Sequence, residues 1–348
     1  MPDRGATYRE ARILELVSIF MRETGEFQQV DLPKAAHMTE TVHWLTIIIP
    51  AYNEEQGIGA VLDGVLALAE ANDWGVLVVD DGSTDGTPDV LARYGNRIRT
   101  LRHSSARGYG ASLKTGIMAT RSENVMFLDA DGQHDPADIP AVAGALKTRE
   151  CVFTVRPRHA GIPLVRRPGK WLLHRLCNFL ANRKIPDINS GFRAGRRHIY
   201  MRMLELLPDG FSFSTTSLMY VMRSRFSHVF VPIQCHARKG TSQVRIFYDG
   251  VKTLLLALRL IMLFDPMRAF GYPALWLMAL GVLYQFYIFF TYRFTIVGGA
   301  LLLILAGVIL FFFGLLGDQI ASLRKEISSF NCLLWEDRES REDRDHAG

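Results

Sequence analysis

The chain lacks the cysteine patterns that build zinc sites or disulfide frameworks. It has four cysteines, no two of which form a Cys-x-x-Cys pair. We therefore expect reduced, structural thiols and a reducing compartment. These cysteines are Cys151, Cys177, Cys235 and Cys332.

The sequence also lacks a strong charge of one sign and an apolar run near its start. The net charge of +5 is mild, and the basic residues cluster beside apolar segments, which favours a lipid bilayer over nucleic acid as partner. Charged residues interrupt positions 1–25, so we expect no signal peptide. Apolar residues at helical spacing predict an amphipathic helix in an N-terminal extension, residues 1–43, which docks on the rest of the protein or on the membrane.

Two long uncharged runs are present near the C-terminus, at 269–292 and 294–317, with Arg293 between them. As a helix each run would reach about 36 Å, enough to cross a hydrocarbon core of about 30 Å. They predict a two-helix transmembrane hairpin over residues 268–318. Because basic residues gather at its open ends, we expect the large N-terminal part in the cytoplasm. The flanking residues are Arg259, Arg268, Arg324 and Lys325. Residues 319–348 would be a cytoplasmic tail, disordered from residue 336.

Three β-rich runs in the first half of the chain each end in a polar loop. They are "LTIIIP" at 45–50, "GVLVVD" at 75–80 and the start of "NVMFLDADGQ" at 124–133. Helical patterns follow them, for example Ile58 to Leu68. Continuous apolar strands alternating with helices indicate an α/β fold with a mostly parallel sheet, whose ligands bind beyond the carboxyl ends of the strands.

The strongest chemical signal is "FLDADGQHDP" at 127–136. Asp129 and Asp131 are one residue apart at a strand end, where both carboxylates can reach one Mg²⁺ or Mn²⁺, and Gln133 can add a carbonyl oxygen. Such a cation would neutralise a diphosphate leaving group. An Asp-x-Asp loop also occurs in many ordinary turns.

Two further loops carry candidate binding groups. In "DDGSTDGT" at 80–87, Asp81 can accept hydrogen bonds from a ribose or a base, whereas Asp85 and Thr87 are expected to form the turn and the helix start. In "PAYNEE" at 50–55, Tyr52 offers a ring face for a nucleobase and Glu54 an acceptor, with turn formation as the alternative.

Together, "IIIPAYNEE", "VLVVDDGSTDGT" and "FLDADGQHDP" closely resemble the family 2 glycosyltransferases, within them the dolichol-phosphate mannose synthase-like branch. Further resemblance lies in "RGYGASLKTGI", "NSGFRAGRRHIY", "GFSFSTTSLMYVM" and "RKGTSQ". The resemblance implies a GT-A type nucleotide-sugar-binding domain over residues 44–240. It assigns the nucleotide site to Pro50, Tyr52, Glu54, Val79, Asp81, Asp129 and Ala130, and the metal to Asp129, Asp131 and Gln133.

The resemblance also points to arginines that would meet donor or acceptor phosphates. Arg156 and Arg238 are placed with Asp129 and Asp131 in the catalytic set, with solvated surface charge as the alternative for both arginines. Arg193 is a further candidate, or a structural ion-pair partner.

The sequence departs from the processive members of that family, because it has no Gln-x-x-Arg-Trp motif and no carboxylate in "FSFSTTS" at 211–217. A sugar hydroxyl needs a base to remove its proton, whereas a lipid phosphate is already ionised. Basic amphipathic stretches at 164–184 and in an interface helix over 241–267 can rest on a membrane surface or pack as core helices.

These features predict a metal-dependent inverting glycosyltransferase, multi-pass in the cell (inner) membrane. It would move a hexose, mannose or glucose, from a GDP- or UDP-sugar to a polyprenyl phosphate such as dolichyl or undecaprenyl phosphate. The alternatives are a family member acting on a saccharide or glycerolipid, and a non-catalytic membrane scaffold.

Overall fold

The structure is a computed structural model that describes residues 42–157, 167–235, 246–292 and 297–347. Residues 42–348 form one compact unit. Two predictions, the amphipathic helix within the N-terminal extension and a phosphate contact from Arg238, lie outside the described residues.

The described part of the chain contains a seven-stranded sheet in the order β3-β2-β1-β4-β6-β5-β7. All pairs are parallel except those of β6, which runs antiparallel to both of its neighbours. The strands are β1 Leu45–Ala51, β2 Gly75–Asp80, β3 Arg99–Arg102, β4 Asn124–Phe127, β5 Cys151–Val155, β6 Arg193–Arg196 and β7 His228–Pro232. The mostly parallel sheet that the apolar runs predicted is therefore confirmed.

Helices cover both faces of the sheet, because alternate residues of its buried strands point to opposite sides. Ile47 and Ile49 of β1 pack with α2 and α5, whereas Ile48 packs with α4, α7 and α8. The domain's helices are α2 Ile58–Asn72, α3 Thr87–Ala92, α4 Tyr109–Ala119, α5 Ile139–Leu146, α6 Arg167–Ala181, α7 Arg197–Arg202, α8 Phe213–Arg223 and α9 Ile246–Phe264. Short 3-10 turns are η1 Gly95–Arg97, η2 Pro136–Asp138 and η4 Leu204–Leu206.

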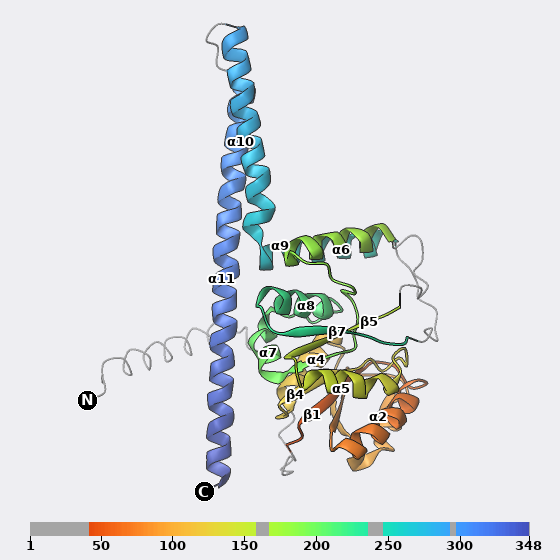
Figure 1. Ribbon diagram of the computed structural model, residues 1–348. Coiled ribbons are helices and arrows are strands. Elements are labelled where there is room, and N and C mark those ends of the chain that lie inside the picture. Colours follow the sequence, from red (N-terminus) through yellow and green to blue (C-terminus); the bar gives the residue numbers. More distant parts are fainter. Residues whose placement is uncertain (1–41, 158–166, 236–245, 293–296, 348) are drawn as a thin grey trace, which may run out of the picture. The chain divides into compact units, whose positions relative to one another are not determined.

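The amphipathic stretches form α6 and α9, which contact each other and α8 (Figure 1). Their buried faces contribute Leu173 and Leu260 to the core. Their other faces carry large apolar side chains that are exposed to solvent: Trp171 is 62% exposed and Leu255 is 59% exposed. Helices whose outer faces mix exposed apolar and basic side chains, as Arg175 of α6 and Arg259 of α9 show, fit a membrane surface better than they fit water.

Residues 269–291 and 298–317 of the two uncharged runs lie in two long helices, α10 Pro266–Thr291 and α11 Gly298–Ala347, which pack along each other (Figure 1). Small residues allow the close approach: a side chain at Gly281 would collide with Ile304, and one at Gly307 with Met278. Both helices are long and apolar enough to cross a membrane, and only 17% of the most apolar window of each is buried.

The C-terminal part differs from the sequence-based expectation. The prediction of disorder from residue 336 is wrong, since α11 continues to Ala347. No glycine or proline interrupts residues 318–347, and acidic and basic residues recur there at helical spacing. Ser328 of α11 also donates a hydrogen bond to the Arg202 carbonyl of α7 at 2.5 Å, so α11 contacts the domain at this point.

Candidate active site

The loops after β1 and β2 are bound together by their own polar groups. The backbone N–H of Asn53 donates to Ser83 at 3.0 Å, and the N–H of Thr84 donates back to the Asn53 side chain at 2.9 Å. The N–H of Glu54 donates to the Thr87 hydroxyl at 2.9 Å. These loops therefore form one rigid rim at the carboxyl edge of the sheet. From this rim the Tyr52 ring is 49% exposed.

Asp85 and Thr87 have the turn and helix-start role that the sequence predicted. One Asp85 carboxylate oxygen accepts from both the N–H and the hydroxyl of Thr87, at 3.0 and 2.6 Å. This is the arrangement by which acidic side chains satisfy free N–H groups at a helix start.

Asp81 is buried and holds the loop that follows β3. Its oxygens accept from the N–H groups of Arg107 and Gly108, at 2.9 and 2.7 Å, and one of them lies 2.7 Å from Nδ1 of His103. The other ring nitrogen of His103 lies 3.0 Å from the Thr115 hydroxyl. A carboxylate has about four acceptor positions, so Asp81 is mostly occupied by the protein itself.

Pro50 and Val79 are register partners on β1 and β2. Both are buried in the strands, and Val79 is 0% exposed. Any contact of Val79 with a nucleoside would therefore come from its backbone. Ala130, which is also buried, follows Asp129 at the end of β4.

Asp129 lies at the centre of the candidate site. Its Oδ1 accepts from the Tyr109 hydroxyl at 2.8 Å, and its Oδ2 lies 3.5 Å from Nε2 of the buried His134. Burial opposes ionisation of Asp129, but His134, Tyr109 and the charge of Arg193 outweigh that effect and hold its pKa below the usual value. Gly191 passes so close that any β-carbon there would collide with the Asp129 carboxylate. Asp129 is thus a fixed anion at neutral pH.

Asp131 and Gln133 lie together in the same loop. The N–H and the amide nitrogen of Gln133 donate to Asp131 at 3.1 and 2.7 Å. Asp131 is partly exposed, so its carboxylate can reach a ligand. Within the described ranges no group of three or more His, Cys, Asp or Glu residues could hold a metal ion. The chain thus offers two carboxylates and an amide, an all-oxygen set that suits Mg²⁺ or Mn²⁺ when a ligand's phosphates complete the coordination.

Arg156 and Arg193 both lie near this loop, but the protein already engages them. Arg156 binds Asp187 with two hydrogen bonds, at 2.8 and 3.0 Å. Arg193 is fully buried and donates to the carbonyls of Ser190 and Ser214 and to the Ser217 hydroxyl. Arg156 is therefore not the solvated surface charge that the sequence left open for it, and the hydrogen bonds of Arg193 give that residue a structural role.

The Arg156–Asp187 pair gives the fold a testable acid sensitivity. Burial of Asp187 opposes its ionisation, but hydrogen bonds from Arg156 outweigh this and lower its pKa. A lowered folded-state pKa gives stability that is present above the unfolded value of 3.8 and is lost as the pH falls through the folded value. We expect Asp187→Asn to lower the free energy of unfolding at pH 7 by about 1 to 2 kcal/mol. This is less than a fully buried charged pair would contribute, because the Arg156 side chain is 30% exposed and solvent screens the interaction.

The measurement is chemical denaturation of the full chain at a series of pH values. Asp209→Asn is the control, since its partner Lys114 forms a more exposed pair and should contribute less than about 0.5 kcal/mol. An Asp187→Asn penalty that stays constant below pH 3 would contradict the assignment.

Four residues of the site have no role assigned from the sequence: Tyr109, His134, Asp187 and Gly191. All lie inside or beside motifs that the sequence displays, such as "RGYGASLKTGI" and "NSGFR". The sequence does not show that these residues converge on Asp129 and Arg156, because the start of α4, the β4 loop and the segment before β6 are far apart along the chain.

The acidic loops lie at the carboxyl ends of β1, β2 and β4, which is the edge where open α/β sheets bind their ligands. The glycosyl transferase family 2 profile matches residues 46–204, and the GtrB C-terminal hairpin profile matches residues 265–323. The chain therefore contains a family 2 glycosyltransferase domain, followed by a hairpin of the GtrB type.

Individual relatives agree with this assignment. The low-salt glycan biosynthesis hexosyltransferase of Haloferax volcanii is 26% identical over 69% of this chain and 58% of its own length. The dodecaprenyl-phosphate galacturonate synthase of Rhizobium johnstonii is 28% identical over 47% of this chain and 51% of its own. The dolichyl-phosphate beta-glucosyltransferase of Saccharomyces cerevisiae is 25% identical over 68% of this chain and 80% of its own length. The chain thus spans little more than half the length of the first two.

The fold also matches a solved structure. Glucosyl-3-phosphoglycerate synthase from Mycobacterium tuberculosis, crystallised with Mn²⁺, uridine diphosphate and phosphoglyceric acid, superposes with a TM-score of 0.51 at 23% identity. The match covers 63% of this chain and 78% of that one. It supports the GT-A fold.

Proposed function

We propose that this protein transfers a hexose, mannose or glucose, from a UDP- or GDP-sugar to a polyprenyl phosphate. One observation carries the choice of acceptor: the segment 211–217, where processive members of the family would carry an acidic base, contains no carboxylate. Residues 214–217, at the start of α8, have only hydroxyl side chains, all of them buried. The Asp81 carboxylate accepts a hydrogen bond from the Gly108 N–H, and Asp187 and Asp209 form ion pairs with Arg156 and Lys114.

The lack of a carboxylate in this segment bears on the acceptor because a hydroxyl acceptor needs a base to remove its proton and a phosphate does not. A sugar hydroxyl must lose its proton as it attacks, whereas a phosphate monoester already carries about 1.5 to 2 negative charges at pH 7. The names of the yeast and Rhizobium relatives, which include dolichyl phosphate and dodecaprenyl phosphate, point the same way.

The proposed reaction is a single displacement. A phosphate oxygen of the lipid forms a bond to the anomeric carbon, the bond to the nucleotide diphosphate breaks with its electron pair on the diphosphate, and the configuration inverts. Asp131, Gln133 and Asp129 would hold a Mg²⁺ or Mn²⁺, whose chemistry is to neutralise charge on the departing diphosphate. Tyr109 and His134 keep Asp129 ionised and fixed in position. The exposed ring of Tyr52 would stack on the base.

The same proposal places the protein in a membrane. The α10–α11 hairpin would cross the bilayer, and α6 and α9 would rest in its headgroup layer with the domain on the cytoplasmic side. This arrangement would bring a lipid phosphate to the domain while its chain stays in hydrocarbon.

The test is a panel of UDP- and GDP-hexoses incubated with the full chain, polyprenyl phosphate and Mn²⁺ or Mg²⁺. We expect a labelled lipid product that releases its sugar in mild acid, because the sugar is attached to phosphate through its anomeric carbon. A labelled product stable to mild acid would contradict the phosphate acceptor. No product with any donor would contradict the transfer itself.

A further inference from the structure

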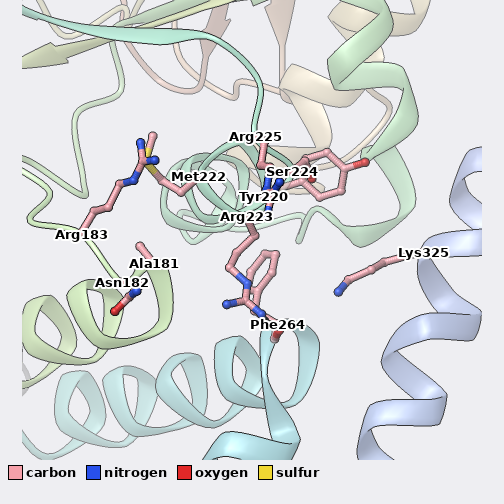
Figure 2. A pocket seen from close by; sticks show the side chains of 10 residues that line it. All are labelled: Ala181, Asn182, Arg183, Tyr220, Met222, Arg223, Ser224, Arg225, Phe264 and Lys325. Atoms are coloured by element: carbon pink, nitrogen blue, oxygen red, sulfur yellow. Dashed lines mark hydrogen bonds between the residues drawn. The ribbon is translucent and has the colours of Figure 1, made fainter.

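The feature that we consider lies apart from the acidic loops of the candidate active site. A cavity of about 610 Å³ opens where α6, α8 and α9 end and α11 passes by (Figure 2). Buried Ala181, Met222 and Phe264 supply apolar walls. Neither Asp129 nor Asp131 lines it. We call it the basic pocket; its lining residues are Ala181, Asn182, Arg183, Tyr220, Met222, Arg223, Ser224, Arg225, Phe264 and Lys325.

Four of these ten lining residues are arginine or lysine and none is acidic. Arg223 stabilises the fold, because it donates to the carbonyls of Leu180 and Phe264, both at 3.2 Å, and lies 3.3 Å from Asp265. It therefore fastens the ends of α6 and α9, where helix carbonyls lack partners.

The other three cations make no comparable ion pair. In the part of the chain that the structure describes, no carboxylate lies within ion-pair distance of Arg183, Arg225 or Lys325. The nearby Asp265 is already shared by Arg223 and Arg268, at 3.3 and 3.5 Å. Lys325 extends from α11 toward the helix ends that carry Arg223 and Phe264 (Figure 2). Like charges that line one pocket repel one another, and an anion bound in the pocket would reduce that repulsion.

The position of the pocket indicates which anion. Phe264 ends α9 and Pro266 begins α10, so the pocket lies at the base of the hairpin. The same end of α9 presents apolar side chains to the outside, with Leu258 45% and Met262 40% exposed. If the hairpin crosses a bilayer, the pocket lies at headgroup depth, with acyl chains beside α9 and α10. Basic pockets of this kind on the cytoplasmic side hold lipid headgroups.

We propose that the basic pocket binds the phosphodiester headgroup of an anionic membrane phospholipid, through Arg183, Arg225 and Lys325. The lipid would fix the interface helices against the hairpin without taking part in transfer. This inference rests on the proposed membrane placement and is independent of the transfer chemistry.

The test uses the purified full chain in neutral detergent and phosphatidylglycerol that is fluorescent in its acyl chain. Binding is followed by titration, with unlabelled phosphatidylglycerol, phosphatidylcholine, polyprenyl phosphate and inorganic phosphate as competitors. We expect phosphatidylglycerol to compete at least about tenfold better than the other three. Changing Arg183, Arg225 and Lys325 together to glutamine should weaken phosphatidylglycerol binding about tenfold or more.

The matched control changes Arg93, Lys147 and Arg149 to glutamine, because these exposed residues lie at the ends of α3 and α5 and their replacement removes the same charge elsewhere. The control should bind like the wild type. If the triple pocket variant does not fold, Arg225→Gln and Lys325→Gln are measured singly, and each should weaken binding severalfold.

Three results would overturn the proposal: equal competition by phosphatidylcholine, equal weakening in the control variant, or stronger competition by inorganic or polyprenyl phosphate. Transfer is measured separately in phosphatidylcholine nanodiscs, where the pocket variant should keep the wild-type rate. Failure of the wild type to transfer there would count against the proposed function and leave the lipid result standing.

Discussion

The Asp131→Asn variant is expected to lose sugar transfer by about 10² to 10³-fold, the rate equivalent of a few kcal/mol of charge stabilisation. The substitution keeps an oxygen that can accept from Gln133, but it removes the negative charge that a divalent cation requires. Because Asp131 is partly exposed, the free energy of unfolding should change by less than about 0.5 kcal/mol. A specific loss of rate with an intact fold would identify the metal-binding role.

The experiment measures initial transfer rates across a Mn²⁺ titration, together with Mn²⁺ binding by electron paramagnetic resonance. Asp89→Asn is the matched control, since this exposed aspartate lies in the first turn of α3, away from the β4 loop. We expect Asp131→Asn to bind Mn²⁺ at least tenfold more weakly, with Asp89→Asn unchanged. Wild-type transfer and Mn²⁺ affinity in Asp131→Asn would remove the metal site from the mechanism.

Strands β1, β2 and β4 were predictable because each is a short, continuous apolar run that is buried on both faces. Ile47, Ile48 and Ile49 show this, since a strand with three successive apolar residues needs a partner layer on each side. The antiparallel strand β6 was not predictable. Its sequence, Arg193–Arg196, contains two arginines, and only the structure shows that β6 fills the gap between β4 and β5.

The acidic residues of the candidate site could be predicted from the sequence. The residues that fix their positions could not. Asp129 and Asp131 follow β4, so their place at the edge of the sheet follows from the strand itself. The partners of Asp129 include Tyr109 of α4 and Gly191 of the loop before β6, and such long-range contacts leave no local pattern. The arginines show the same limit: Arg156 faces Asp187 because two loops meet, which neither loop encodes alone.

The second large effect that we expect comes from Gly191, a residue without a side chain. Its backbone lies against the Asp129 carboxylate, so the β-carbon of Gly191→Ala must displace that carboxylate. The displacement would break the hydrogen bond from Tyr109 and move Asp129 from His134. Because catalysis depends on positions held to within about 0.5 Å, the transfer rate should fall about 10 to 100-fold.

The control for this change is Gly144→Ala in α5, where nothing lies within 4 Å of the added carbon. Alanine there should stabilise the helix by about 0.5 to 1 kcal/mol and leave transfer unchanged. Initial rates and chemical denaturation of both variants separate the two effects. Loss of stability without loss of rate in Gly191→Ala would mean that Asp129 tolerates displacement. The fixed position of that carboxylate would then have no part in transfer, and the mechanism would rest on Asp131 and Gln133 alone.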